Sequence, residues 1–535
     1  MRVTLHFHGY RYFPYERRWA LRETETLFGQ NPSVQGGVIQ IDVPDERLPL
    51  LQRLTYFAKA VTESGEVVVP DQAKWEASAN GGKLGAANSS VSRQPTRYSL
   101  HGLHEYKGRF NPQVVRAIGN LLRLEPGSRV LDPFCGSGTV LLEAAHLGWD
   151  ALGVDLNPLA VMIANAKVDL FHSQSDELMA HLEAVLVRVG ELAEVLGDCE
   201  AGFNSQTRAT LRAAGLSQPL PGRGYLERWF PMDVLAQFQA VLGLIDDVPD
   251  GTARTALVAC LSNLVRDVSL QDPGDLRIRR RKDPSDNYPA LLLFAEQLTK
   301  LLSCLRSAAP LKGSAPTGTR QLAVHTDSRS PTGLIQAAAL VTSDDSLFDA
   351  AITSPPYASA LPYVDTQRLS LVLLGFADAD DIYAMGRGLV GTREITTTQR
   401  REFEIAIESN QAEFPRVVQE FLADLLRGVR DADVGFRRRN RPALLYKYLL
   451  DMRSAFEAAH ACLKQGSAWA LVVGTNRTRL EGREIIIPTP DLLAGVAATA
   501  GFAVERIEPL DTYPRYGMHS ANSINSESLV VLRAI

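Results

Sequence analysis

Hydrophobic and polar positions change their period along the chain, and these changes divide it into regions. Residues 3, 5 and 7 alternate as in a strand, residues 15–27 follow a helical period, and residues 37–43 have the pattern of a second strand. Residues 77–94 are rich in Ala, Ser, Asn and Gly, lack apolar periodicity and predict a linker. Residues 1–95 therefore predict a small N-terminal α/β domain that ends in a linker.

From residue 96 onward the pattern predicts alternating helices and strands. This rhythm is typical of a doubly wound, mostly parallel α/β sheet. The predicted helices cover 114–122, 139–147 and 158–168, and the predicted strands cover 129–132, 151–155, 321–325, 350–353, 469–474 and 529–532. Residues 96–170 and 316–535 are therefore expected to form two halves of one core.

Two insertions interrupt the predicted core. Residues 171–315 predict a helical insert with helices over 182–196, 232–245, 253–265 and 288–305. Residues 376–441 predict a charged insertion that is helical in its later half. The fold class is therefore α/β with a helical insert and a small N-terminal domain.

Composition and charge narrow the classes of function. The 535 residues are enough for two or three domains, and their apolar runs are too short to span a membrane. The first residues lack the apolar core of a signal peptide, so a cytoplasmic protein with no membrane partner is expected. The five cysteines are far apart, without a CxxC pair or a histidine at ligand spacing, so neither a disulfide framework nor a metal site is expected. A net charge of −5 means that affinity for nucleic acid has to come from local basic clusters.

A glycine-rich turn follows the strand at 129–132. The turn reads Asp132-Pro133-Phe134-Cys135-Gly136-Ser137-Gly138-Thr139, and its glycines let the backbone turn sharply and approach a ligand closely. The next strand ends at Asp155, whose carboxylate can accept hydrogen bonds from both hydroxyls of a ribose. A helix-capping role for Asp155 is the alternative. The turn is neither GxGxxG nor followed by GK[ST], which argues against NAD and ATP.

A second motif follows the strand at 350–353. In Ser354-Pro355-Pro356-Tyr357, the serine hydroxyl and the Pro355 carbonyl can accept the two N–H hydrogens of an exocyclic amine and free its lone pair for attack. The two prolines stiffen the loop, and Tyr357 offers a face on which a base rotated out of a duplex can stack. No cysteine follows a proline, which argues against methylation at cytosine C5 through a thiolate.

Together, and in this order, the two motifs resemble those of S-adenosyl-L-methionine-dependent DNA amino-methyltransferases of the cytosine-N4 and adenine-N6 types, known from restriction–modification systems. The resemblance implies a Rossmann-like core, S-adenosyl-L-methionine as cofactor, and double-stranded DNA as partner. The motif Ser-Pro-Pro-Tyr, with serine in place of aspartate at position 354, resembles that of the cytosine-N4 enzymes. The implied catalytic residues are Ser354, Pro355, Pro356 and Tyr357.

The same resemblance implies individual cofactor contacts. Asp132 is expected near the methionine ammonium, Asp155 at the ribose, and Asp327 near the adenine amino group. The segment 101–112 resembles the element that forms the methionine pocket in these enzymes. The expected cofactor-binding set is Asp132, Pro133, Phe134, Gly136, Ser137, Gly138, Thr139, Asp155, Asp327, Tyr106 and Phe110.

Two basic clusters are candidates for contact with DNA. They consist of Arg277, Arg279, Arg280, Arg281 and Lys282 in the helical insert, and of Arg437, Arg438 and Arg439 in the second insertion. Clustered arginines can contact phosphates and guanine edges, although a solvated loop is the alternative. The sequence carries no endonuclease signature, so a cognate restriction endonuclease, where one exists, is expected on a separate chain.

Three other functions stay open. Adenine N6 is a possible target in place of cytosine N4. Transfer-RNA guanine-N2 methyltransferases have a similar glycine turn, an Asp-Pro-Pro-Tyr motif and a small N-terminal α/β domain. A non-catalytic regulator that binds S-adenosylmethionine or DNA is the alternative outside the enzymes.

Overall fold

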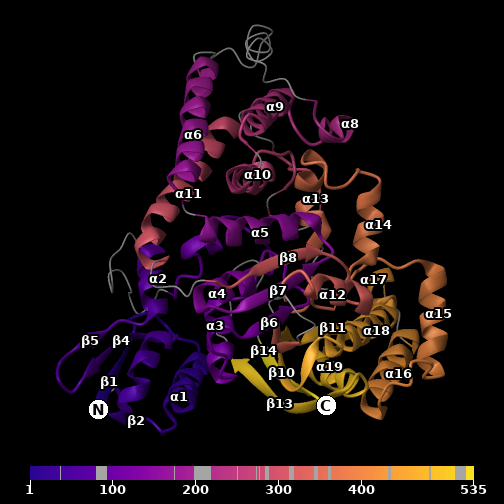
Figure 1. Ribbon diagram of the computed structural model, residues 1–535. Helices are drawn as coiled ribbons and strands as arrows, with labels where there is room; N and C mark the ends of the chain where they lie inside the picture. Colours follow the sequence, from indigo (N-terminus) through magenta and orange to yellow (C-terminus); the bar gives the residue numbers. More distant parts are fainter. Residues whose placement is uncertain are drawn as a thin grey trace.

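The computed structural model describes residues 1–35, 38–79, 93–173, 175–197, 219–249, 251–272, 274–275, 278–283, 288–312, 318–342, 347–358, 363–431, 435–480, 483–511 and 526–535. Figure 1 shows a small N-terminal sheet, a central sheet covered by helices, and a group of helices that extends away from the central sheet.

The N-terminal region forms a five-stranded sheet whose pairings are all antiparallel. Val3 and Leu5 alternate with more exposed neighbours, which gives β1 one buried face. The elements are β1 (Arg2–Phe7), α1 (Pro14–Phe28), β2 (Ser33–Gln35), β3 (Val38–Asp42), η1 (Asp45–Arg53), β4 (Phe57–Thr62), β5 (Val67–Val68) and α2 (Asp71–Ala79). The linker predicted from residue 77 begins too early, because α2 continues to Ala79; most of that stretch, residues 80–92, lies outside the described residues.

The central sheet has seven strands in the order β13-β14-β10-β9-β6-β7-β8. Every pairing among β10, β9, β6, β7 and β8 is parallel, whereas β14 runs antiparallel to both of its neighbours. The strands are β6 (Arg129–Asp132), β7 (Asp150–Asp155), β8 (Gln321–His325), β9 (Phe348–Thr353), β10 (Leu463–Gly474), β13 (Phe502–Asp511) and β14 (Ser526–Ala534). The predicted doubly wound, mostly parallel fold is confirmed.

Helices cover both faces of this sheet, and the alternation of side chains along each strand explains why. Val130 packs into the apolar cluster that contains α3 (Pro112–Leu121) and α4 (Thr139–Leu147), while its neighbour Leu131 packs on the opposite face. That opposite face is covered by α12 (Pro331–Ala338), α18 (Arg441–His460) and α19 (Thr489–Ala498). The helix α5 (Pro158–His172) packs beside α4 and against β8.

The helical insert contains the predicted helices in longer form. They are α6 (Asp176–Gly197), α9 (Met232–Asp246), α10 (Thr252–Val265) and α11 (Ala290–Lys312), with the short α8 (Arg223–Leu226) before α9. A separate apolar cluster forms their core, with Phe238, Leu261 and Leu298 fully buried.

The second insertion differs from the expectation, because it is helical in its earlier half as well. Its helices are α14 (Asp381–Gly388), α15 (Thr397–Glu408), α16 (Arg416–Asp431) and α17 (Phe436–Arg439), and α13 (Tyr363–Leu373) precedes them. Leu422 and Leu426 of α16 are buried in the apolar cluster beneath the sheet, so this insertion is part of the core packing.

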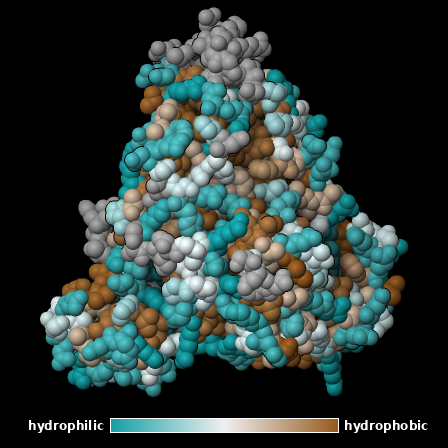
Figure 2. Space-filling view, in the orientation of Figure 1, coloured by the Kyte–Doolittle hydropathy of each residue, from teal (hydrophilic) through white to brown (hydrophobic). Residues whose placement is uncertain are grey.

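A hairpin without a counterpart in the sequence prediction follows β10. It consists of β11 (Asn476–Leu480) and β12 (Arg483–Ile487). The face seen in Figure 2 mixes hydrophilic and hydrophobic residues. Within the described ranges, no helix is both long enough and apolar enough to cross a membrane.

Candidate active site

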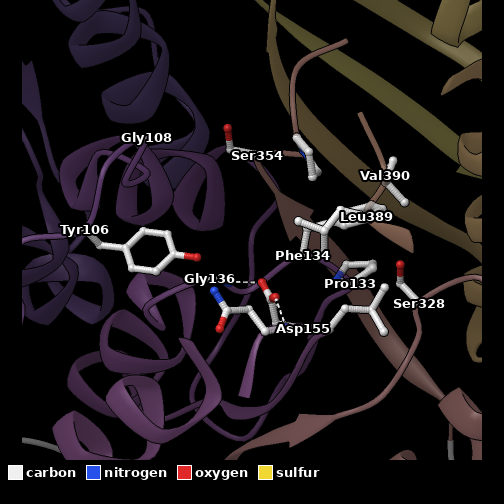
Figure 3. Close-up of a pocket in the computed structure, with 13 residues that line it drawn as sticks. Tyr106, Gly108, Pro133, Phe134, Gly136, Asp155, Ser328, Ser354, Leu389 and Val390 are labelled. Carbon is white, nitrogen blue, oxygen red and sulfur yellow. Dashed lines mark hydrogen bonds between the residues drawn. The ribbon is translucent and has the colours of Figure 1, made fainter. Parts of the chain in front are cut away.

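A cavity lies at the carboxyl ends of the parallel strands, where the strand order reverses between β6 and β9. Ligands bind at this place in open α/β sheets because two diverging loops leave a crevice there. Segments after β6, β7, β8 and β9 contribute to its wall, together with a segment before α3 and one from the second insertion (Figure 3). The lining residues are Tyr106, Gly108, Pro133, Phe134, Gly136, Asp155, Leu156, Asn157, Ser328, Ser354, Pro356, Leu389 and Val390.

The glycine turn after β6 needs glycine at two positions. Gly136 and Gly138 have φ angles of 47° and 77°, in the left-handed region that side chains disfavour. A Cβ on Gly138 would also lie 2.7 Å from Cβ of Ala164 in α5. The turn therefore packs closely on α5 and presents Gly136 to the cavity opposite the Tyr106 ring.

Asp155 ends β7 with its carboxylate in the cavity wall. Oδ2 accepts a hydrogen bond from the Gly136 backbone N–H (3.0 Å), and Oδ1 accepts one from Asn157 N–H (2.8 Å). Each oxygen keeps a second lone pair for a ligand hydroxyl. Burial raises the pKa of Asp155 to about 6. The residue therefore holds the turn and can also bind a ribose.

Asp132 joins the two halves of the site. Its Oδ1 accepts hydrogen bonds from the Thr353 hydroxyl (2.6 Å) and from the Phe134 backbone N–H (3.1 Å), and burial raises its pKa to about 7. Thr353 is the residue before Ser354. One hydrogen bond therefore fixes the start of the Ser354 loop relative to the glycine turn.

A buried lysine supports the turn from beneath. Lys167 of α5 is fully buried and donates a hydrogen bond to the Ser137 carbonyl (2.7 Å). Burial lowers its pKa to about 7. Sequence reasoning missed Lys167, because a lysine within an apolar helix carries no motif of its own.

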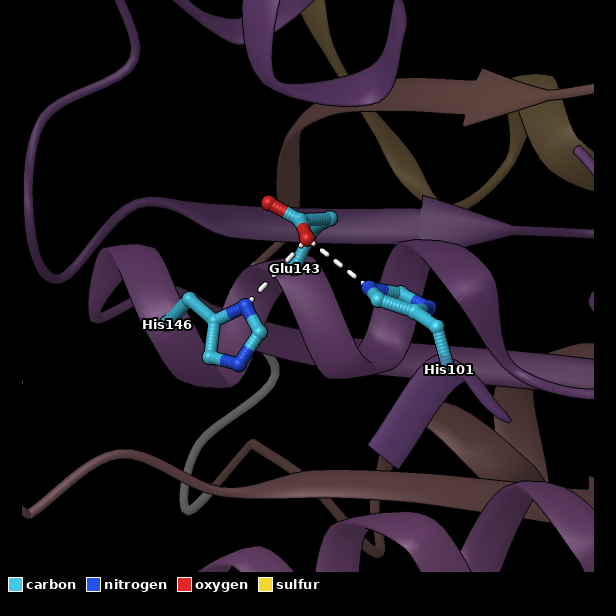
Figure 4. Close-up of side chains that lie close together, drawn as sticks. All are labelled: His101, Glu143 and His146. Carbon is cyan, nitrogen blue, oxygen red and sulfur yellow. Dashed lines mark hydrogen bonds and ion pairs between the residues drawn. The ribbon is translucent and has the colours of Figure 1, made fainter. Parts of the chain in front are cut away.

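The segment that carries Tyr106 is attached to α4 through Glu143. Its carboxylate accepts hydrogen bonds from Tyr98 (2.7 Å), His101 (2.9 Å) and His146 (3.2 Å), as Figure 4 shows for the two histidines. Arg116 of α3 binds the second oxygen at 3.1 Å. All these side chains are buried, and η2 (Ser99–Gly102) lies within this network.

The His101, Glu143 and His146 ligand atoms lie within 4.8 Å of one another, a spacing that a metal ion could use. Burial lowers the pKa of His101 to about 3 and also lowers the pKa of His146, while Arg116 is among the groups that hold the pKa of Glu143 well below its usual range. A neutral pair of imidazoles around one Glu–Arg ion pair is electrically balanced. A buried divalent ion would add two positive charges beside Arg116, so the cluster fits a hydrogen-bonded network better than a metal site.

The predicted catalytic loop forms another part of the cavity wall. Ser354 and Pro356 line the cavity, and Tyr357 Oη donates a hydrogen bond to Glu527 at the start of β14 (2.9 Å). Gly391, at φ 75°, packs so closely that a Cβ there would lie 2.8 Å from the Tyr357 carbonyl oxygen. The second insertion therefore supports this loop from outside and adds Leu389 and Val390 to the wall.

Other residues of the expected cofactor set have less direct positions. Thr139 starts α4 and its hydroxyl lies 3.5 Å from the Phe110 carbonyl, which ties the turn to the preceding segment. Asp327 is held by Arg329, which donates to both of its oxygens, and the next residue, Ser328, is the one in the cavity wall. The hydrogen bonds from Arg329 help to lower the pKa of Asp327. Contact between Asp327 and an adenine stays a prediction.

The basic cluster of the helical insert is largely engaged with the protein. Arg281 donates to the carbonyls of Asp267 (2.6 Å) and Gln271 (2.9 Å), and Arg280 donates to the Arg228 carbonyl. Arg279 and Lys282 are exposed, and Arg279 forms an ion pair with Asp275 at 3.5 Å. Arg277 lies outside the described residues.

In the second cluster, Arg438 and Arg439 are exposed on α17, and the side chain of Arg437 lies outside the described part. DNA contact by either cluster stays a prediction.

Comparison with known proteins matches residues 103–177 to the family model described as UPF0020, an RMKL-like methyltransferase domain. This stretch contains Tyr106, the glycine turn and Asp155, which form the cofactor side of the cavity. Residues 103–177 are therefore similar to a methyltransferase domain.

Three relatives place this match in a wider context. The type II methyltransferase M.MjaII of Methanocaldococcus jannaschii is 36% identical over 111 residues, which cover 21% of this chain and only 20% of that enzyme. The type II methyltransferase M.BsoBI of Geobacillus stearothermophilus is 24% identical over 447 residues, covering 77% of this chain and 80% of that enzyme. A tRNA (guanine(10)-N2)-dimethyltransferase of Methanothermobacter thermautotrophicus is 40% identical over 52 residues, 10% of this chain and 16% of that enzyme.

Proposed function

We propose that this S-adenosylmethionine-dependent methyltransferase modifies the exocyclic amino group of a base in double-stranded DNA, with cytosine N4 as the favoured target. One observation carries the proposal. Ser354 and Pro356 line the same cavity as Gly136 and Asp155, so the predicted amine-binding loop and the predicted cofactor-binding turn face one space.

The chemistry required of the loop is acceptance of hydrogen bonds. Ser354 Oγ and the Pro355 carbonyl would accept the two N–H hydrogens of the amine, which draws the nitrogen towards tetrahedral geometry. S-adenosylmethionine supplies an electrophilic methyl group when bound. The amine nitrogen held by these acceptors would take that methyl group, so that an N–C bond would replace the S–C bond and one N–H proton would pass to water. The Asp132–Thr353 hydrogen bond keeps Ser354 in register with the cofactor side during this attack.

Residue types in the site favour one atom of the base as the methyl acceptor. The serine at position 354 favours cytosine N4, and adenine N6 is the nearest alternative. Cytosine C5 is disfavoured because it needs a thiolate, and burial raises the pKa of Cys135, the cysteine in the glycine turn, well above its usual value.

The choice of nucleic acid follows the long alignment with a type II methyltransferase, which extends over both halves of the core. The tRNA guanine-N2 alternative is supported by a much shorter match. A cognate restriction endonuclease on a separate chain belongs to the same proposal, because type II methyltransferases of restriction–modification systems act beside one.

Tritiated S-adenosylmethionine distinguishes these alternatives. The protein would be incubated with genomic DNA from a host that lacks it, or with bulk tRNA, and the labelled nucleoside would be identified by chromatography. Label in N4-methyldeoxycytidine is expected, and Ser354→Ala should abolish it without loss of cofactor binding. Label in N6-methyldeoxyadenosine would support the alternative target, and label in tRNA alone would overturn the DNA assignment. Cofactor binding without transfer to either would indicate the non-catalytic regulator.

A further inference from the structure

The hairpin β11–β12 rises from the catalytic edge of the central sheet. It follows Gly474, the last residue of β10, and β10 runs parallel to β9, which ends at Thr353. Both strands therefore point to the same edge, and the first residue of the hairpin, Asn476, contacts Ala358 next to the Ser354–Tyr357 loop.

Buried contacts fix the hairpin in this place. Asn476 donates from Nδ2 to the carbonyl of Ala358 (3.0 Å), one residue after Tyr357. Leu480 packs against α16 so closely that a Cβ on Gly428 would lie 3.1 Å from its Cδ1 atom. Ile485 and Tyr357 both pack against the apolar cluster beneath the sheet. The ribbon is thus positioned by the same structure that positions the catalytic loop.

The residues on the outer side of the ribbon are more exposed than those on its inner side. Asn476, Thr478 and Leu480 are buried, whereas Arg477 and Arg479 between them are exposed. Opposite them in the register lie Ile486, which is 63% exposed, and Glu484. Arg477 and Glu484 form a long ion pair of 3.5 Å between half-exposed side chains, which a competing anion can replace at little cost.

The hairpin carries a net positive charge, unlike the chain as a whole. The described residues of the hairpin include three arginines and one glutamate, whereas the whole chain has a net charge of −5. A two-stranded antiparallel ribbon has the width that the major groove of B-DNA admits, and outward arginines can contact phosphates or guanine edges.

We propose that the outer face of the β11–β12 hairpin binds the DNA duplex next to the target base, with Arg477 and Arg479 as its contacts. The proposal deepens the proposed function and rests on it. Because the hairpin is attached one residue after Tyr357, a duplex held on it would bring its target strand to the mouth of the cavity.

The test compares two double variants of equal charge change. Arg477→Ala with Arg479→Ala removes the proposed contacts. Arg188→Ala with Arg306→Ala is the matched control, because these arginines of α6 and α11 have side chains that are 43% and 61% exposed and are paired with Asp247 and Glu183. A fluorescein-labelled random-sequence duplex of about 30 base pairs would be titrated over a salt series. Each arginine that contacts a phosphate contributes about one unit to the log–log slope of affinity against salt.

The hairpin variant should lower the slope by about two units, and the control should leave it unchanged. S-adenosylmethionine affinity and thermal midpoint should stay at wild-type values in both, which excludes misfolding. Arg477→Lys with Arg479→Lys should restore the slope where the contacts are phosphates. If Arg477→Ala with Arg479→Ala keeps the wild-type salt slope but changes the methylated sequence, the two arginines contact bases, which also supports the proposal.

Equal affinity and slope in the hairpin and control variants, with an unchanged methylated sequence, would overturn the inference while the proposed function stood. A wild-type protein that neither binds this duplex nor methylates genomic DNA would instead overturn the proposed function. Loss of tRNA binding in place of DNA binding would assign the hairpin to RNA and overturn the inference as stated.

Discussion

Asp155 shows how burial prepares a single carboxylate for binding. Burial raises its pKa to about 6, and two backbone N–H groups partly offset this effect. Only the ionised carboxylate can accept hydrogen bonds from both ribose hydroxyls with full strength. Cofactor affinity should therefore be lost as the pH falls through about 6, by up to about tenfold per pH unit. Calorimetric titration with S-adenosylmethionine between pH 8 and pH 5.5 measures this dependence.

Burial raises the pKa of Asp132 to about 7, in the same range. Variants of Asp155 are therefore needed to show which part of the pH dependence comes from Asp155. Asp155→Ala should weaken binding by about 1.5–3 kcal/mol at pH 8, because charge-assisted hydrogen bonds are lost. Asp155→Asn should remove the lower of the two titration steps. Unchanged affinity in Asp155→Ala would remove this residue from the cofactor site.

Tyr357 and Glu527 form a second residue-level pair, in which one side chain orients the other. Tyr357→Ala should lose base stacking of about 1–3 kcal/mol while cofactor affinity stays nearly intact. Tyr357→Phe keeps the ring and should recover most of that loss. Glu527→Gln keeps an acceptor for the Tyr357 hydroxyl, so its methylation rate should be close to wild type. Glu527→Ala removes that acceptor, so the ring is no longer oriented and the methylation rate should fall. Methylation rates at subsaturating DNA rank these variants; a wild-type rate for Tyr357→Ala would contradict the assignment.

Among the elements, those with strong apolar periodicity could be predicted from the sequence. The strands β6 and β7 and the helices α4 and α5 were predictable because apolar residues predominate in them and a glycine or proline lies near at least one end of each. The hairpin β11–β12 could not be predicted, since its buried residues include the polar Asn476 and Thr478, and the partner of Asn476 is the distant Ala358 carbonyl. The places of Leu389 and Val390 in the cavity wall depend on how the second insertion folds back, which no local pattern records.

The Glu143 network makes an element-level prediction, because it joins α3, α4 and the segment that carries Tyr106. Removing one partner of a buried ion pair leaves the other charge uncompensated, so Glu143→Ala should cost about 3–5 kcal/mol of unfolding free energy. It should also weaken S-adenosylmethionine binding, because Tyr106 loses its support. Glu420→Ala removes an exposed partner of Arg416 and should change stability by no more than about 0.5 kcal/mol. Urea unfolding of both variants compares the two costs.

At the level of the whole molecule, the insertions surround the cavity from two sides. The helical insert reaches the Tyr106 side, where Ser262 lies 3.0 Å from His104 and Asn263 accepts from the Glu105 backbone N–H at 2.7 Å. The hairpin and the second insertion occupy the Tyr357 side. A duplex that delivers a base to this cavity would lie between them, so both sides are expected to contact one DNA molecule.

This arrangement predicts that the two sides contribute independently to DNA affinity. Arg280 and Arg281 hold the insert together through carbonyl groups, so their removal would disturb the fold. Arg279 and Lys282 are exposed and are the residues to replace. Arg279→Ala with Lys282→Ala should lower the salt slope by about two units, and combination with Arg477→Ala and Arg479→Ala should lower it by about four, because distant sites add. Anisotropy titrations over a salt series measure the slope of the insert variant, the hairpin variant and their combination. An unchanged salt slope in the insert variant would mean that the Arg279 and Lys282 side chains are only solvated. The hairpin would then be the side that binds DNA.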